Sequence, residues 1–251
     1  MRVHCQSKAA SEILQALGLA HLMTPDRTQA DLVVTHAPRP DAESPNTLTL
    51  SPRTVEDTFD DILRVAEALG EPARGLDLVV RLRGRLHAAQ DFVNPYLDGP
   101  AVLILDSLDP LRLPGLWVPQ LVERAGGQFP WNPTSAAHEA GAAAGPQMAY
   151  RTAGEAVTIS PTQAEMHRPE FVVFALVGQS LEEARDAVRE VTAQSWFQSL
   201  PAVHKGQVAI IAGDTLATPG PGLVEAFEFL VGFLNGREEL IPEGLRDARI
   251  A

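Results

Sequence analysis

The sequence predicts an α/β fold with mainly parallel strands, and the alternation of two segment types is the evidence. Continuous apolar runs at 101–106, 171–176 and 207–212 are each followed by a stretch of helical periodicity. Apolar runs without polar alternation are typical of strands that are covered on both faces, as in parallel sheets. Strands that alternate with helices indicate βαβ connections, so we expect parallel pairing.

The first 70 residues repeat the alternation on a smaller scale. We expect short strands at 2–5, 30–36 and 47–51, and a helix at 11–19. A second helix follows, because Thr54 and Asp57 have the spacing of a capping box and Gly70 supplies a stop.

One long helix is predicted over residues 72–93. Pro72 is suited to its first position, and an apolar periodicity continues to Val93. At 1.5 Å per residue the helix would be roughly 30 Å long, enough to span a domain. We expect five of its residues to face inward: Leu76, Val79, Val80, Leu86 and Ala89.

Composition excludes several function classes. The chain of 251 residues has a net charge of −12, and its basic cluster at 81–85 has the pattern of one solvated helix face, so nucleic acid is not an expected partner. No apolar run reaches the length of a membrane span. The single cysteine, Cys5, rules out an internal disulfide and is expected to be a small core residue.

No catalytic or metal-binding motif is present. The histidines are scattered without zinc spacing, and no nucleophile elbow, P-loop or dinucleotide fingerprint occurs. The sequence therefore predicts a protein that is not an enzyme, with no catalytic residue, no metal site and no cofactor used in catalysis.

Residues 106–127 raise a specific question, because Trp117 follows a strand end beside Pro114 and Gly115. Trp117 either packs in the core under a loop or lines a ligand cleft. The residues alone favour packing in the core, although ligands of α/β proteins bind at the carboxyl ends of the strands.

Three stretches resemble one family. They are "SEILQALGL" (11–19), "ADLVVTH" with "LSPRTVEDTFDDILRVAEALG", and the segments from "VLILDSLDPLRLPGLWVPQLVERAGG" through "PEFVVFALVGQSLEEA" to "LPAVHKGQVAIIAGDTLATPGPGLVEAFEFL". Together they are similar to substrate-binding proteins of ABC importers for cobalamin, siderophore-iron and haem, the helical-linker class (class III), and most of all to the cobalamin-binding subgroup.

The resemblance implies two α/β lobes with mainly parallel sheets, joined by a single long helix. We expect a reduced N-terminal lobe at 1–71, the linking helix at 72–95 and a C-terminal lobe at 96–251. It also implies a bulky small-molecule ligand, such as cobalamin or another corrinoid, and an ABC permease as a possible partner.

We expect the ligand site in the loops after the strands, with Trp117 partly exposed there. The candidate ligand-binding residues are Trp117, Pro114, Leu116, Gly178, Gln179, Thr215 and Leu216, with His36 from the smaller lobe. For Leu116, Leu216 and Gly178 ordinary loop packing is an equal alternative.

Departures from the family pattern leave a second hypothesis open. The stretch 22–30 is too short for the usual strand-helix unit, and "TLATPGPG" (215–222) lacks the aromatic residues and arginines of relatives. Corrinoid binding should therefore be weaker than in relatives. The alternatives are a cytosolic ligand-responsive or interaction protein on a degenerate scaffold, or a binder of siderophore-iron or haem. A less favoured third is an enzyme whose site is assembled only in three dimensions.

The expected compartment follows from the first residues. Residues 1–19 include Glu12 and do not have the pattern of a signal peptide. As it stands the sequence predicts a cytoplasmic protein, or a periplasmic or cell-surface one if a leader was removed.

Overall fold

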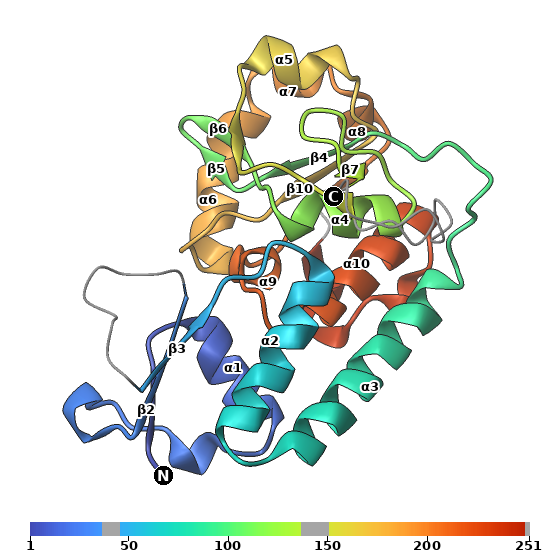
Figure 1. The fold of residues 1–251 in the computed structure, drawn as a ribbon. Coiled ribbons are helices and arrows are strands. Elements are labelled where there is room, and N and C mark those ends of the chain that lie inside the picture. Colours follow the sequence, from blue (N-terminus) through green and yellow to red (C-terminus); the bar gives the residue numbers. More distant parts are fainter. Residues whose placement is uncertain (37–45, 137–150, 249–251) are drawn as a thin grey trace. The chain divides into compact units, whose positions relative to one another are not determined.

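The computed structural model describes residues 1–36, 46–136 and 151–248 of the chain (Figure 1). Contacts divide the chain into two compact units. The first unit comprises residues 1–87 and 218–224, and the second comprises 88–217 and 225–251. Each unit contains its own three-stranded parallel sheet, so the predicted α/β class is confirmed. The predicted boundaries at 71/72 and 95/96 stay a prediction.

The first unit is built on strands β1 (Val3–Cys5), β2 (Leu32–His36) and β3 (Thr47–Leu50), in that spatial order. Helix α1 (Lys8–Ala16) begins at Ser7, whose hydroxyl accepts a hydrogen bond from the amide of Ala10. The stretch 22–30, too short for a strand-helix unit, follows the 3₁₀ turn η1 (Ala20–Leu22) and contains a second one, η2 (Arg27–Gln29). The short linker therefore leaves β1 paired directly with β2.

Helix α2 (Val55–Ala68) has the predicted capping box. The Thr54 hydroxyl accepts from the amide of Asp57, and the Asp57 carboxylate accepts from the amide of Thr54. Gly70 follows the end of the helix, as predicted. Its φ of +74° is the left-handed conformation that glycine commonly adopts there. Local chemistry thus fixes both ends of α2.

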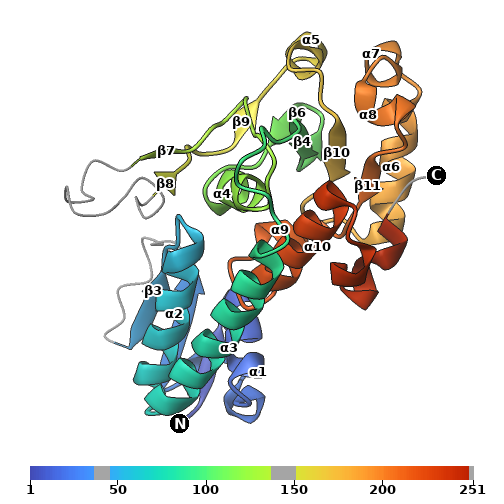
Figure 2. The same ribbon diagram turned by 90° about the vertical axis from the view of Figure 1, so that its right-hand side faces the viewer.

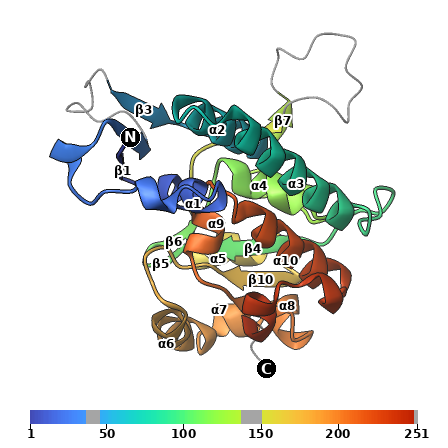
Figure 3. The same cartoon turned by 90° about the horizontal axis from the view of Figure 1, so that it is seen from below.

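Helix α3 (Pro72–Gln90) lies beside α2 (Figures 1 and 3) and is continuous, as predicted, but it ends before Val93. A Cβ atom on Gly75 would lie 2.5 Å from the Cβ of Ala66, so glycine permits the close approach of α2. Two predicted inward residues are wrong: Leu76 is 58% and Val80 61% exposed. The buried stripe instead contains Leu78, Val79, Leu82, Leu86 and Ala89.

The second unit centres on β4 (Val102–Leu105), β10 (Phe171–Phe174) and β11 (Val208–Ile210), with β10 in the middle (Figure 2). All three strands pair in parallel. The helices that follow the β4 and β10 segments are α4 (Trp117–Arg124) and α6 (Leu181–Thr192), and α10 (Leu223–Asn235) follows β11. Fully buried Phe174, Phe197 and Phe229 contribute to the core.

Several short elements complete this unit. Strands β5 (Ser107–Leu108) and β6 (Leu111–Leu113) form a hairpin that β9 (Val157–Thr158) extends, where only loops were predicted. Strands β7 (Ser135–Ala136) and β8 (Arg151–Thr152) also pair. The remaining short helices are α5 (Pro161–Met166), α7 (Ser195–Gln198), α8 (Pro201–His204), α9 (Asp214–Ala217), η3 (Glu238–Leu240) and η4 (Glu243–Ala248). Of the predicted loops, 37–46 and 128–155, the parts at 37–45 and 137–150 lie outside the described residues.

Candidate functional site

The candidate site in the second unit lies where the three parallel strands end. The amide of Val177, just beyond β10, donates to the carbonyl of Asp106, just beyond β4, over 3.1 Å. A Cβ atom on Gly213, after β11, would lie 2.1 Å from the carbonyl oxygen of Leu176. The three loops therefore meet at one sheet edge, which is the ligand-binding edge in parallel α/β sheets.

Trp117 corrects one expectation. Its side chain is 7% exposed, and its indole N–H donates to the carbonyl of Leu216 over 2.8 Å. The predicted partial exposure is therefore wrong, because the ring packs between α4 and the segment after β11. Leu216 itself is 2% exposed. The structure brings these two predicted residues together, and their hydrogen bond joins α4 to the segment after β11. Direct contact with a ligand stays a prediction.

The loop before α4 is held in an unusual conformation. Leu116 has φ of +56° and ψ of −115°, a combination that normally favours glycine. Its amide donates to the carbonyl of Gly154 over 2.8 Å, and a Cβ atom on Gly115 would lie 2.3 Å from that same oxygen. Pro114 and Leu116, both half-buried, are thus fixed on a rigid loop.

Gly178 and Gln179 are the most accessible of the predicted residues. Both are exposed, and Gly178 has φ of +77° in a turn where the amide of Gln179 donates to the carbonyl of Leu176. Thr215 is half-buried in α9. Gln179 and Thr215 therefore offer polar groups that a ligand can reach at this edge.

His36 belongs to the first unit, at the carboxyl end of β2. Both ring nitrogens are buried, and neither forms a hydrogen bond with the described residues. Burial lowers the pKa of His36, so the imidazole is neutral at physiological pH. Both nitrogens are enclosed in this structure, and no contact with a ligand is described. The role of His36 in ligand binding therefore stays a prediction.

Sequence reasoning missed an ion pair at the end of β4. Arg112 in β6 donates through Nε to the carboxylate of Asp106 over 2.8 Å. The carboxylate is nearly buried, whereas the arginine side chain is 42% exposed. An aspartate directly after a buried strand was the available signal, but the β5–β6 hairpin that brings Arg112 back was not predicted.

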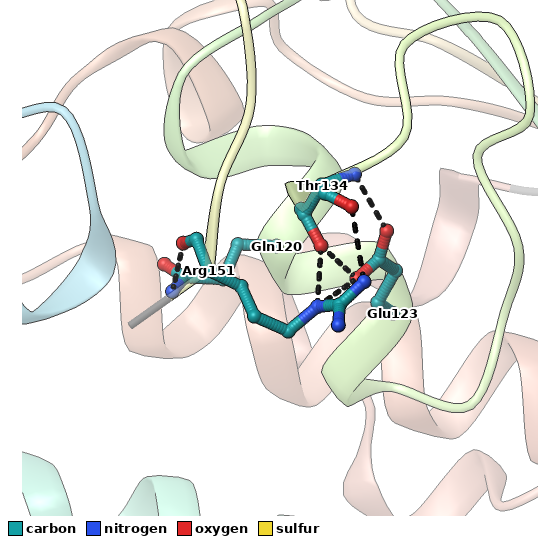
Figure 4. A network of polar contacts seen from close by, with 4 residues as sticks. All are labelled: Gln120, Glu123, Thr134 and Arg151. Carbon is teal, nitrogen blue, oxygen red and sulfur yellow. Dashed lines mark hydrogen bonds and ion pairs between the residues drawn. The ribbon is translucent and has the colours of Figure 1, made fainter. Parts of the chain in front are cut away.

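A second polar network fixes the β7–β8 pair against α4 (Figure 4). The Glu123 carboxylate accepts hydrogen bonds from the amide and the hydroxyl of Thr134. Arg151 donates through Nε to the Thr134 hydroxyl over 2.7 Å and lies 3.4 Å from Glu123. Gln120 donates to the Arg151 carbonyl. Because each of the four residues has a partner within the network, this arrangement is structural.

Two observations bear on metal binding and on thiol reactivity in the part of the chain that the structure describes. Within those residues no group of histidine, cysteine and carboxylate side chains has the geometry of a metal site. Burial raises the pKa of the half-buried Cys5 thiol, which disfavours the reactive thiolate. Among the same residues, none of the helices combines the length and the apolar character needed to cross a bilayer.

Comparison with solved structures identifies the architecture. A periplasmic binding protein from Veillonella parvula superposes with a TM-score of 0.71 at 16% identity, over 94% of this chain and 91% of that one. This chain has the fold of the periplasmic binding proteins.

Two further similar structures have named ligands. The periplasmic heme-binding protein RhuT from Roseiflexus sp. RS-1 in apo form gives a TM-score of 0.70 at 19% identity, over 94% of this chain and 98% of that one. The periplasmic vitamin B12 binding protein BtuF of Vibrio cholerae gives 0.65 at 16% identity, over 95% and 98%. No family model and no curated protein sequence matches the chain. At these identities the likeness is one of fold.

Proposed function

We propose that this chain is a solute-binding protein that captures a bulky metal-containing ligand and delivers it to an ABC permease, in the periplasm or at the cell surface. The observation that supports the proposal is fold similarity over nearly the whole of both chains to proteins named for heme, vitamin B12 and Fe3+-hydroxamate transport. Such capture needs a shaped site with a few polar groups and no nucleophile.

Cobalamin or another corrinoid is the ligand that we favour within this class. The support is the sequence pattern of residues 106–127, which resembles the cobalamin-binding subgroup. The same fold serves heme and iron-hydroxamate in the neighbours. The rigid Leu116 loop and the exposed turn at Gly178 and Gln179 are the surfaces that we expect the ligand to contact.

The test is a calorimetric and spectroscopic titration with cobalamin, hemin and a ferric hydroxamate. We expect one of the three to bind, and Gln179→Ala to weaken that binding about twofold to tenfold by removing one hydrogen bond. Gln15→Ala changes another exposed glutamine, on α1, and should leave affinity unchanged. Absence of binding by all three at high micromolar concentration would favour the alternative, a ligand-responsive or interaction protein without a transport role.

A further inference from the structure

The loops at the carboxyl edge of the second unit's sheet contain a single basic residue. The segments that follow the three strands, 106–116, 175–181 and 211–217, include one arginine and neither lysine nor histidine. That residue is Arg112, in β6. Because parallel α/β sheets bind ligands at this edge, Arg112 is the one cationic side chain that these loops offer to a ligand.

Asp106 holds Arg112 in one position. The Nε atom of Arg112 donates to the Asp106 carboxylate over 2.8 Å, and that carboxylate belongs to a side chain that is only 11% exposed. The backbone supports the same pairing, because the amide of Asp106 donates to the carbonyl of Arg112 over 2.9 Å. The guanidinium is therefore pre-organised, which lowers the entropy that it would lose on binding a ligand.

The outer part of the Arg112 guanidinium is not used within the described residues. Arginine has N–H donors on Nε and on both Nη atoms, and neither Nη atom forms a hydrogen bond or an ion pair with any residue that the structure describes. Leu111 and Leu113 on either side are buried, so Arg112 lies on the opposite face of β6, and its side chain is 42% exposed. The Nη donors are thus available to a ligand.

Arg112 is connected to the exposed turn at Gly178 and Gln179. The carbonyl of Asp106, which anchors Arg112, accepts a hydrogen bond from the amide of Val177 over 3.1 Å, and the turn follows directly. The β5–β6 hairpin also lies beside α6, the helix that begins just after this turn (Figure 1). A bulky ligand that contacts Gln179 can therefore also reach Arg112.

The chemistry of these free donors determines which group they bind. A planar guanidinium matches the oxygens of a carboxylate or a phosphate, and such charge-assisted hydrogen bonds are stronger than neutral ones. The Asp106–Arg112 pair has no net charge and the whole chain carries −12, so long-range attraction contributes little. Directed hydrogen bonds from the Nη atoms therefore decide the selectivity of this position.

We propose that Arg112 is a specificity-determining residue that binds a carboxylate or phosphate group of the ligand. This inference rests on the proposed function and narrows its ligand class. Hemin carries propionate carboxylates, and cobalamin carries a phosphate in its nucleotide tail, whereas the ferric hydroxamate ferrichrome has neither group. Arg112 therefore favours hemin or cobalamin over ferrichrome, and the titration below distinguishes the two sources of the anionic group.

The test is a titration of the full chain with ferrichrome and with two pairs of ligands, each pair differing in the anionic group. Hemin is compared with its dimethyl ester, and cyanocobalamin with dicyanocobinamide, which lacks the nucleotide tail and its phosphate. We expect the anionic member of one pair to bind about tenfold to a hundredfold more tightly than its analogue. Arg112→Gln should abolish this preference and leave the affinity for the analogue unchanged, whereas a purely structural role would weaken both equally.

Two further variants complete the design. Arg112→Gln leaves the nearly buried Asp106 carboxylate without its cation, so Asp106→Asn combined with Arg112→Gln provides a neutral pair that keeps the fold and should show the same loss of preference. Arg189→Gln on α6 removes an arginine that lies 3.0 Å from Asp186 and should leave the preference intact. A preference that survives in both Arg112 variants, equal affinity within each pair, or binding of ferrichrome alone would overturn the inference and retain the proposed function. Absence of binding by all the ligands would overturn both.

Discussion

At the scale of single residues, Trp117 shows how a contact distant in sequence changes the role of a side chain. The strand end and the Pro/Gly loop around it were visible in the sequence, and they correctly place Trp117 at the carboxyl edge of the sheet. The sequence left its burial as one of two alternatives, because the partner of its indole N–H is a carbonyl 99 residues away. Trp117 therefore contributes to the packing of the loops at the site and little to the exposed surface of the site.

This position predicts a loss of stability when the indole is changed. Trp117→Phe keeps an aromatic ring but leaves the buried carbonyl of Leu216 without its donor. We therefore expect the free energy of unfolding to fall by about 1–3 kcal/mol. Trp117→Ala should cost about 3–5 kcal/mol. Urea unfolding followed by circular dichroism measures both, and equal stability of all three proteins would show that Trp117 is not packed as described.

His36 predicts a pH dependence. Its pKa is lowered by burial in the folded chain, so between the lowered value and the ordinary value of about 6.5 the unfolded state binds more protons. The contribution of His36 to stability is complete above pH 6.5 or so and declines as the pH falls toward the lowered pKa. We expect His36→Gln to flatten the slope of unfolding free energy between pH 7 and pH 5, measured by urea titration at each pH. An unchanged slope would contradict burial of the imidazole.

At the scale of elements, local chemistry was enough for α2 but not for α3. The Thr54 capping box and Gly70 determine the ends of α2 within its own sequence. In α3 apolar residues occur on two sides, and their spacing alone does not indicate which side is buried. Packing against α2 decides which side of α3 is buried, because Gly75 allows the two helices to approach closely. Leu78 and Val79 are buried, whereas Leu76 and Val80 stay exposed. The β5–β6 hairpin was not predicted for the same reason. Strands of two or three residues depend on pairing with a neighbouring strand, and the sequence pattern within each strand does not indicate that pairing.

We expect alanine substitutions at the two glycines of α3 to change stability in opposite directions. Gly84 has no atom within 4 Å of where a Cβ would lie, so Gly84→Ala should stabilise the chain by about 0.5–1 kcal/mol through helix propensity. Gly75→Ala gains the same propensity but forces a Cβ against Ala66, and we expect a net loss of about 1–3 kcal/mol from overpacking. Thermal unfolding of both variants measures the difference. Equal effects at the two positions would show that α2 and α3 do not pack as the structure has them.

At the scale of the whole molecule, the sequence pattern does not reveal which segments of the chain make up each unit. The first unit ends at 87 and then recruits residues 218–224, more than a hundred residues later. A Cβ atom on Gly220 would lie 2.9 Å from the Glu12 carboxylate and 3.8 Å from the Cα atom of Ala9, so this segment rests directly on α1. The first unit is therefore incomplete when only its contiguous residues are considered.

This predicts that a fragment of residues 1–90 folds less stably than the same fragment with residues 217–225 appended through a flexible Gly/Ser linker. Leu223 and Val224 are 3% and 2% exposed in the whole chain, and a buried aliphatic side chain contributes about 1.5–3 kcal/mol. Even one such contribution is a large part of the stability of a small unit, which is typically about 5–15 kcal/mol. The measurement is thermal and urea unfolding of both fragments by circular dichroism. Leu223→Asp in the appended segment serves as the control, because it places a carboxylate where the side chain is 3% exposed and should cancel the gain. Two fragments of equal stability would show that residues 218–224 are held by the second unit.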